Sequence, residues 1–258
     1  MLRITWIGHS CFKLEKDGYT IITDPYADGS VPGYTPVHEK ADMVLCSHEY
    51  ADHNFRDGVE LIERSGLPFH VEVIETYHDE VCGKKRGPNK IFIIDDGENR
   101  VAHFGDLGCE LTPEQMEKLQ NLDVAMVPVG GYFTIDARQA ADLVCSLKPE
   151  IVIPMHYRSD KYSFGYDVIG TVDEFTEIME SRAVQNRANG AVLSASGARL
   201  APTGAGSVEA RPASMIRKAN HGHIMDNVKT LSGSEIEIAS MNASGPQVTV
   251  LQPRNMAI

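Results

Sequence analysis

Four short apolar segments each end just before a histidine or an aspartate, and this repeated arrangement constrains the fold more than any other feature. Apolar runs of this length fit buried strands, and strand ends in a layered α/β fold converge on one edge. One histidine in such a position is unremarkable, but four segments predict a shared site. The pairs are Met43–Cys46 with His48, Val71–Ile74 with His78, Val101–Phe104 with Asp106, and Ile151–Pro154 with His156.

Turn and capping signals place strands in the first 110 residues and helices mixed with strands after them. This mixture predicts a layered α/β domain. The predicted hairpins are Cys11–Glu15 with Tyr19–Thr23, around Asp17-Gly18, and Lys90–Asp95 with Arg100–Phe104. Predicted helices follow the capping residues Thr112 and Asp136 and cover Thr171–Arg182, and further strands are predicted at Glu150–Pro154, Glu235–Ala239 and Gln247–Leu251.

Composition excludes several classes of protein. The 258 residues carry 36 acids against 24 bases, and a formal charge of -12 should repel a nucleic-acid backbone. The five cysteines are scattered without a C-x-x-C pair, which favours a reduced, cytoplasmic protein. No apolar run approaches the ~18–20 residues of a membrane span, so we expect no membrane partner. A homo-oligomeric state is left open.

One stretch differs from the rest of the chain. Residues 184–228 contain 18 Ala, Gly or Ser among 45 positions, and no apolar period persists through them. We therefore expect a single domain over residues 1–258, interrupted by a low-complexity insertion or lid at 184–228.

Imidazole and carboxylate side chains are the ligands that zinc, manganese and iron(II) share. A catalytic metal needs ~3–4 protein ligands and an open position for water. One such set is available from Asp52, His53, Asp106 and His156. The sequence thus predicts one or two divalent ions, zinc or manganese first and iron as a further option.

The ordered motifs resemble those of the metallo-β-lactamase superfamily, whose fold is an αββα four-layer sandwich. The superfamily signature is H-x-H-x-D-H, and this chain has His48-Glu49-Tyr50-Ala51-Asp52-His53. The flanking motifs resemble the branch that includes L-ascorbate-6-phosphate lactonase. They are Gly8-His9-Ser10-Cys11-Phe12, Ile21-Ile22-Thr23-Asp24-Pro25-Tyr26, His103-Phe104-Gly105-Asp106-Leu107-Gly108, Val127-Pro128-Val129-Gly130-Gly131 and Ile153-Pro154-Met155-His156-Tyr157.

The resemblance implies a role for each ligand position. A first metal site would use His48, residue 50 and His78; a second would use Asp52, His53 and His156; and Asp106 would bridge them. Tyr50 stands where the family has its second histidine, and tyrosine ligates only as phenolate, with an ordinary pKa of ~10. Three interpretations follow: one metal mainly at the second site, two metals with the first weakly bound, or a degenerate member. We favour the first.

The resemblance implies a metal-dependent hydrolase in which a metal-activated hydroxide cleaves a small ester or lactone, with anionic substrates among the candidates. Asp52 and Asp106 would be its catalytic carboxylates, with Asp52 orienting the nucleophile or moving its proton. A phosphodiesterase with a small substrate is the alternative enzyme. A non-catalytic binding or regulatory module on a degenerate metal site is the alternative from another class.

Several other residues have two interpretations each. Asp24 and His103 could support metal ligands from behind, or form ordinary turn and strand hydrogen bonds. Lys84 and Arg86 could receive an anionic substrate group, although most charge runs are solvated loops. Two further residues are expected to be mainly structural: Tyr157, which could also reach substrate, and His9, at the end of an N-terminal strand.

Overall fold

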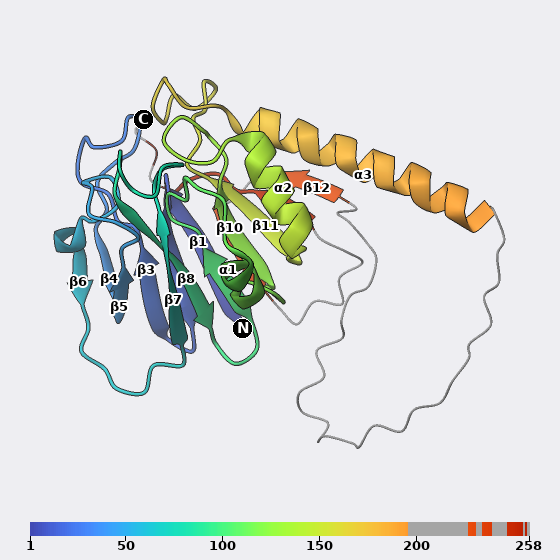
Figure 1. Ribbon diagram of the computed structural model, residues 1–258. Helices are drawn as coiled ribbons and strands as arrows, with labels where there is room; N and C mark the ends of the chain where they lie inside the picture. The colour runs from blue at the N-terminus through green and yellow to red at the C-terminus, as the bar shows by residue number, and fades with distance from the viewer. Residues whose placement is uncertain (196–226, 231–233, 239–246, 255, 257–258) are drawn as a thin grey trace, which may run out of the picture.

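Two facing β-sheets form the body of the protein (Figure 1). The computed structural model describes residues 1–195, 227–230, 234–238, 247–254 and 256. The five-stranded sheet has the order β13-β1-β2-β3-β5, and the seven-stranded sheet has the order β12-β14-β11-β10-β9-β8-β7. A small parallel pair, β4 with β6, lies beside them.

The strands of the five-stranded sheet are β1 (Leu2–Gly8), β2 (Cys11–Lys16), β3 (Tyr19–Thr23), β5 (Met43–Leu45) and β13 (Glu235–Ile238). Those of the seven-stranded sheet are β7 (His70–Tyr77), β8 (Pro88–Asp95), β9 (Arg100–His103), β10 (Val124–Pro128), β11 (Ile151–Met155), β12 (Asn227–Thr230) and β14 (Gln247–Val250). The pair comprises β4 (Glu39–Ala41) and β6 (Val59–Leu61), preceded by the 3-10 helix η1 (Arg56–Gly58).

Both predicted hairpins are confirmed. Strands β2 and β3 pair antiparallel around Asp17 and Gly18, which have φ values of 52° and 82°. Two consecutive residues with positive φ give the turn whose twist matches the paired strands. Strands β8 and β9 pair in the same way, and β9 then continues the sheet in parallel with β10.

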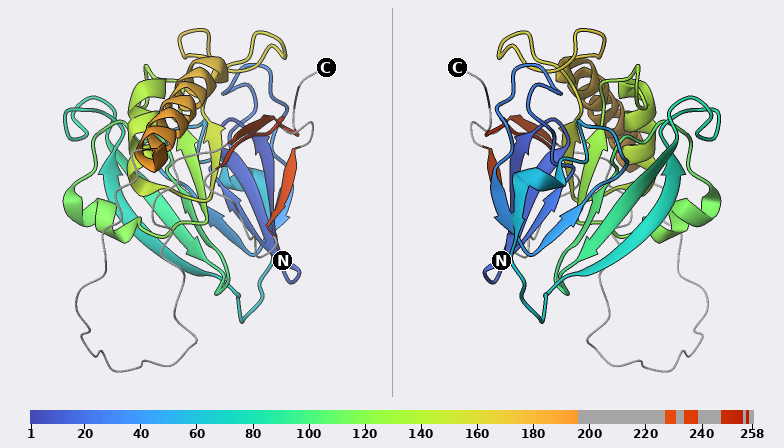
Figure 2. Two further views of the ribbon diagram at one scale, coloured as in Figure 1. Left: turned by 90° about the vertical axis from the view of Figure 1, so that its right-hand side faces the viewer. Right: turned by 90° about the vertical axis from the view of Figure 1, so that its left-hand side faces the viewer.

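The core lies between the two sheets, seen edge-on in Figure 2. Every residue of β10 and β11 is buried, as expected for parallel strands in the middle of a sheet. Large side chains from both halves fill the space, among them Trp6, Phe12 and Phe104. This packing confirms the α/β metallo-β-lactamase type of fold, with two mixed sheets and few helices.

The helices are α1 (Pro113–Lys118), α2 (Ala137–Leu147) and α3 (Val172–Ala195). Both predicted capping boxes form, on Thr112 with Gln115 and on Asp136 with Gln139. Helix α2 packs on β10 and on α3, while α3 also packs on β12, so both cover the seven-stranded sheet. No helix in the described ranges is long and apolar enough to cross a membrane.

Helix α3 corrects the predicted helix boundary. The helix was expected to end at Arg182, but it continues to Ala195 and extends beyond the sheets (Figure 1). Residues 183–195 contain no proline that would end the helix. They also lack a regular apolar period, as is typical of a helix that is not packed along one face. The predicted insertion therefore begins inside a helix, its last two residues belong to β12, and residues 196–226 lie outside the described part.

Replacing Asp136 by alanine should lower the free energy of unfolding by about 1 kcal/mol, because the Asp136 carboxylate accepts the Gln139 backbone N–H at 2.8 Å. Asp136→Asn keeps an acceptor there and should remain close to the wild type. Urea unfolding of both variants at pH 7 checks this expectation. Equal destabilisation of the two variants would contradict the capping role.

Candidate metal centre

A buried carboxylate, Asp106, lies at the centre of a cluster of four imidazoles. Asp106 is 1% exposed. Its oxygens lie 3.2 Å from His78 Nε2, 3.2 Å from His156 Nε2, 3.3 Å from His53 Nε2 and 3.9 Å from His48 Nε2. The structure thus brings together the residues expected to bind metal after four separate strands.

The cluster sits where the two sheets meet, because each contributes loops at the same end. His48 and His53 follow β5 of the five-stranded sheet. The other three residues, His78, Asp106 and His156, follow β7, β9 and β11 of the seven-stranded sheet. This is the convergence of strand ends that the sequence predicted, here at the junction of two sheets instead of on one.

The chain turns sharply into the site at several of these positions. His156 and Asp24 have φ values of 52° and 41°, in the left-handed region that non-glycine residues rarely adopt. Gly105 also has a positive φ of 55°, and a Cβ there would collide with Asn89 and Ser47. Only glycine therefore lets the loop before Asp106 pass this close to its neighbours.

Asp24 lies behind the cluster and holds one of its histidines. Its Oδ2 accepts the Nδ1 hydrogen of His53 at 2.8 Å, and its two oxygens also accept the backbone N–H and hydroxyl of Ser47. A carboxylate on Nδ1 fixes the tautomer and aims Nε2 at a metal. The position is therefore the one expected for a residue that supports a ligand.

His103 supports backbone instead of a ligand ring. Its Nε2 donates to the Ser10 carbonyl at 2.8 Å, and its Nδ1 accepts the Gly105 N–H at 3.2 Å. Burial is the main cause that lowers its pKa, so the ring is neutral. His103 thereby links the loop after β1 to the loop that carries Asp106.

Tyr50 packs its ring against His48 and His78, at centroid distances of 5.2 Å and 5.8 Å, and its hydroxyl bonds to backbone. The hydroxyl donates to the Arg86 carbonyl oxygen at 2.9 Å, and the side chain is among the exposed large residues. A phenol that donates its proton to a carbonyl is not a phenolate ligand. The described first-site group is therefore His48, His78 and Asp106, whose ligand atoms lie within 4.8 Å of one another.

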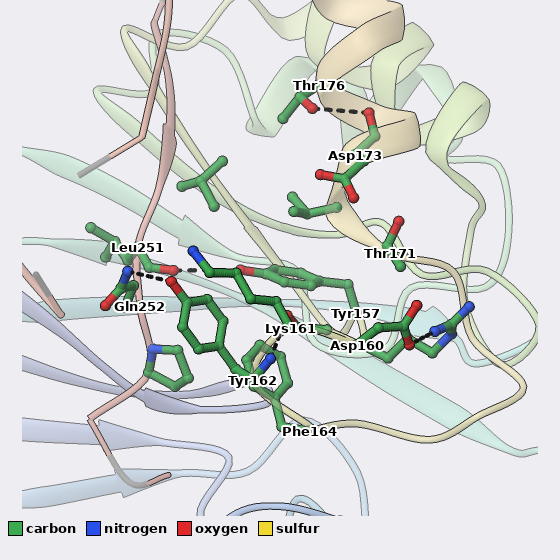
Figure 3. A pocket seen from close by; sticks show the side chains of 15 residues that line it. Tyr157, Asp160, Lys161, Tyr162, Phe164, Thr171, Asp173, Thr176, Leu251 and Gln252 are labelled. Carbon is green, nitrogen blue, oxygen red and sulfur yellow. Dashed lines mark hydrogen bonds and ion pairs between the residues drawn. The ribbon is translucent and has the colours of Figure 1, made fainter. Parts of the chain in front are cut away.

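Tyr157 is placed in the core, apart from the clustered imidazoles. Its ring packs against Trp6 at a centroid distance of 5.3 Å, and its hydroxyl donates to the Leu251 carbonyl. It also lines a cavity of about 430 Å³ with Tyr162 and Gln252, and none of the clustered histidines lines that cavity (Figure 3). The structure thus places Tyr157 in packing contacts, the role that the sequence favoured over substrate contact.

Two residues at the site were undervalued or missed from sequence. His9, expected to be structural, groups with His53 and His156, all ligand atoms lying within 4.8 Å. Tyr166 places its hydroxyl 3.0 Å from Asp52 Oδ2 and 2.6 Å from the Ser30 carbonyl. Tyr166 carries no local motif, and only the fold brings it within reach of residue 52.

The charges of the cluster favour a bound cation. Burial alone would raise the pKa of Asp106, but the histidines, His156 and His53 first, hold it well below its usual value. Burial would lower the pKa of His53, yet Asp106 and Asp24 raise it to about 10. Without another cation, the carboxylates therefore draw a proton onto this imidazole, at the position where a metal would supply the positive charge.

The residues fit a metal by geometry as well. Two ligand atoms that each lie ~2.0–2.1 Å from a tetrahedral ion are about 3.3 Å apart. The Nε2 atoms of His53, His78 and His156 each lie 3.2–3.3 Å from an Asp106 oxygen, which matches that separation. Among the described residues, His48 Nε2, His53 Nε2 and Asp106 Oδ1 are buried without a hydrogen-bond partner. Buried polar atoms are rarely left unpaired, so these three atoms fit the role of metal ligands.

The loop after His78 is built around one carboxylate. Asp79 accepts backbone N–H groups from Val81, Gly83, Lys85 and Arg86 at 2.7–3.0 Å. The loop places the Arg86 guanidinium 4.3 Å from the centroid of the Phe133 ring, and that ring lies 6.5 Å from His156. Arg86 is thus at the rim of the site, while Lys84 is exposed.

Replacing Asp79 by asparagine should destabilise the metal-free protein at pH 7 and the difference should vanish in acid. Burial would raise the pKa of Asp79, but the backbone N–H donors lower it from 3.8 to about 2. A lowered folded pKa means that the ionised form stabilises the fold above pH ~4 and that this stabilisation is lost between ~4 and ~2.

Urea unfolding of both proteins with chelator present, at pH 7, 5 and 3, measures the difference. Asp95→Asn, at the far end of β8, is the matched control. A difference that stays constant down to pH 3 would contradict the role assigned to the Asp79 carboxylate.

Comparisons with known proteins agree with this geometry. Residues 3–156 match the family model described as "Beta-lactamase superfamily domain". A UPF0173 metal-dependent hydrolase of Methanopyrus kandleri is 27% identical over 198 residues, covering 60% of this chain and 84% of that protein. The corresponding protein of Caldivirga maquilingensis is 29% identical over 190 residues, covering 60% and 82%.

Solved structures show the same fold. A structure from Thermotoga maritima, described as a "putative zn-dependent hydrolase of the metallo-beta-lactamase superfamily", covers 98% of this chain and all of its own, with a TM-score of 0.62 and 25% identity. Igni18, a metallo hydrolase from Ignicoccus hospitalis, covers 70% of this chain and 91% of its own, with a TM-score of 0.50 and 25% identity. The chain therefore belongs to the beta-lactamase superfamily and shares the fold of its metal-dependent hydrolases.

Proposed function

We propose that this protein is a metal-dependent hydrolase that cleaves a small, anionic ester or lactone. The observation that carries the proposal is the buried Asp106 carboxylate with four histidine Nε2 atoms within 3.9 Å. The relatives named as metal-dependent hydrolases support the reaction class. The motif resemblance to the branch that includes L-ascorbate-6-phosphate lactonase supports a lactone among the candidate substrates.

A bound divalent metal would supply Lewis acidity, which polarises the scissile group and lowers the pKa of water. Asp52 is the carboxylate placed to orient that water or accept its proton. Its side chain is 19% exposed, unlike the buried Asp106, and its Oδ2 lies 3.9–4.0 Å from His9 and His53. Tyr166, 3.0 Å from the same oxygen, holds the Asp52 carboxylate in place.

The donor set supports zinc or manganese, and iron(II) shares the same preferences. Zinc is the ion named in the description of the Thermotoga maritima neighbour, which makes it the first ion to test. The described groups provide ligands for one ion near His53 and His156 and for a second near His48 and His78. The group near His48 lacks the imidazole that Tyr50 replaces, so it should bind more weakly.

The rim supports an anionic substrate. Arg86 stacks on Phe133 beside His156, and Tyr132 and Tyr50 are exposed aromatic residues nearby. A guanidinium held on an aromatic ring presents its N–H groups to a carboxylate or phosphate. The same feature favours the second candidate, a phosphodiesterase with a small substrate. The formal charge of -12 disfavours nucleic acid.

Hydrolysis should require metal and should fall by at least about 10³-fold in Asp106→Asn, because that change removes the central negative charge. The assay is a panel of lactones, carboxylic esters and phosphodiesters with zinc or manganese added. Asp95→Asn, remote from the site, should retain wild-type rates. Full turnover in Asp106→Asn would overturn the proposal, and turnover of phosphodiesters alone would select the second candidate.

Arg86→Gln should raise KM for anionic substrates by about tenfold and leave KM for neutral analogues unchanged, because it removes one charge from the rim. Lys84→Gln removes the same charge from the exposed part of the same loop and should change neither value. Steady-state kinetics on matched anionic and neutral esters check this. An equal effect of the two variants would show that only general charge matters.

A further inference from the structure

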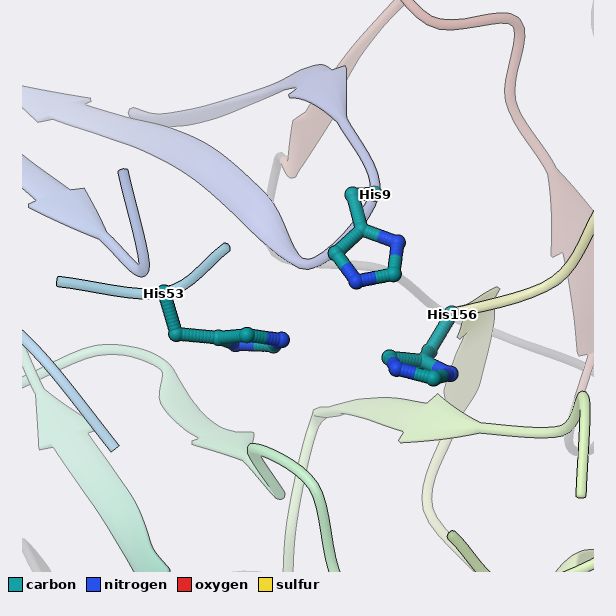
Figure 4. A group of neighbouring side chains, drawn as sticks. All are labelled: His9, His53 and His156. Carbon is teal, nitrogen blue, oxygen red and sulfur yellow. The ribbon is translucent and has the colours of Figure 1, made fainter. Parts of the chain in front are cut away.

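His9 points its ring into the metal centre from a third direction. The residue follows β1, and its ring lies between those of His53 and His156, with centroid distances of 5.1 Å and 4.3 Å (Figure 4). Ligand atoms of the three histidines all lie within 4.8 Å of one another. The His9 Nε2 is also 3.9 Å from Asp52 Oδ2. These distances place three imidazoles around one point, with the Asp52 carboxylate beside two of them, His9 and His53.

The backbone holds His9 in this orientation. Its φ is 51°, in the left-handed region, and its carbonyl accepts the Trp6 indole N–H at 2.9 Å and the His156 backbone N–H at 3.4 Å. The next carbonyl, of Ser10, accepts the His103 ring N–H. A non-glycine residue in a costly conformation that is fixed by three neighbours is the pattern of a side chain positioned for function.

The ring itself has no structural hydrogen bond. His9 is 0% exposed, and neither Nδ1 nor Nε2 has a partner in the part of the chain that the structure describes. His103 shows the contrast, since it is equally buried and uses both ring nitrogens on backbone groups. Burying an imidazole with two unpaired nitrogens costs free energy unless a ligand completes it.

We propose that His9 is a metal ligand that, with His53 and His156, forms a site for one zinc-type divalent ion beside the Asp52 carboxylate. The tyrosine at position 50 removes one imidazole from the expected set, and His9 returns the number of imidazoles to five. His9 lies beside His156, whereas Tyr50 occupies a first-site position. Relative to the expected set, the first site therefore has one imidazole fewer and the second site one more. This inference rests on the metal centre of the proposed function, but not on any particular substrate.

The test measures zinc binding directly, by competition with a chromophoric chelator, in His9→Gln, His156→Gln and His38→Gln. His38 is exposed and outside the cluster. Zinc affinity should fall more than about tenfold in the first two variants, because even residues that only orient a ligand change metal affinity by ~10–100-fold. It should be unchanged in the third variant. Unchanged affinity in His9→Gln would overturn the proposal.

A second measurement needs no variant and holds if His9→Gln does not fold. In the wild-type protein loaded with ¹¹³Cd²⁺ as the probe, the His9 ring protons should show scalar coupling to cadmium, as those of His53 and His156 should. Coupling at His53 and His156 without coupling at His9 would overturn the inference while leaving the proposed function intact. If all three couplings are present but the zinc-loaded wild-type protein does not hydrolyse lactones, the proposed substrate is wrong and the assignment of His9 still holds.

Discussion

The rest of the structure depends on one buried charge, the Asp106 carboxylate. A lone carboxylate in a protein interior is strongly unfavourable, and here it is kept ionised by four imidazoles that reach it from three loops. Those imidazoles are themselves buried and only partly paired. The Asp106 carboxylate therefore needs a positive charge beside it, either a proton on His53 or a bound cation, and loops from both sheets must meet to build the cluster.

Meeting at one point requires unusual backbone. His9, Asp24 and His156 all adopt left-handed φ values, and Gly105 avoids a collision beside Asp106. Each such residue costs free energy, of order 1–3 kcal/mol, which the two-sheet core must offset. The fully buried strands β10 and β11 supply that rigidity and carry His156 directly. Three of the non-glycine residues with positive φ in the described part, His9, Asp24 and His156, therefore lie at the metal centre.

Local sequence rules predicted much of this protein. Asp17-Gly18, Thr112 and Asp136 act through neighbours a few residues away, and their turns and caps are as expected. The sequence did not predict the end of α3, because the residues after Arg182 lack the helical spacing of apolar residues on which the prediction relied. His9 and Tyr166 were undervalued because their partners lie 44 and 114 residues away, at His53 and Asp52. Such separations become contacts only once the two sheets are packed.

The placement of the loops gives the metal a structural consequence. Loops that follow strands of the five-stranded sheet carry His9, His48 and His53, while loops that follow strands of the seven-stranded sheet carry His78, Asp106 and His156. An ion bound by both groups would join the two sheets as a cross-link does. The metal concentration would then set the stability of the folded chain as well as its catalytic rate.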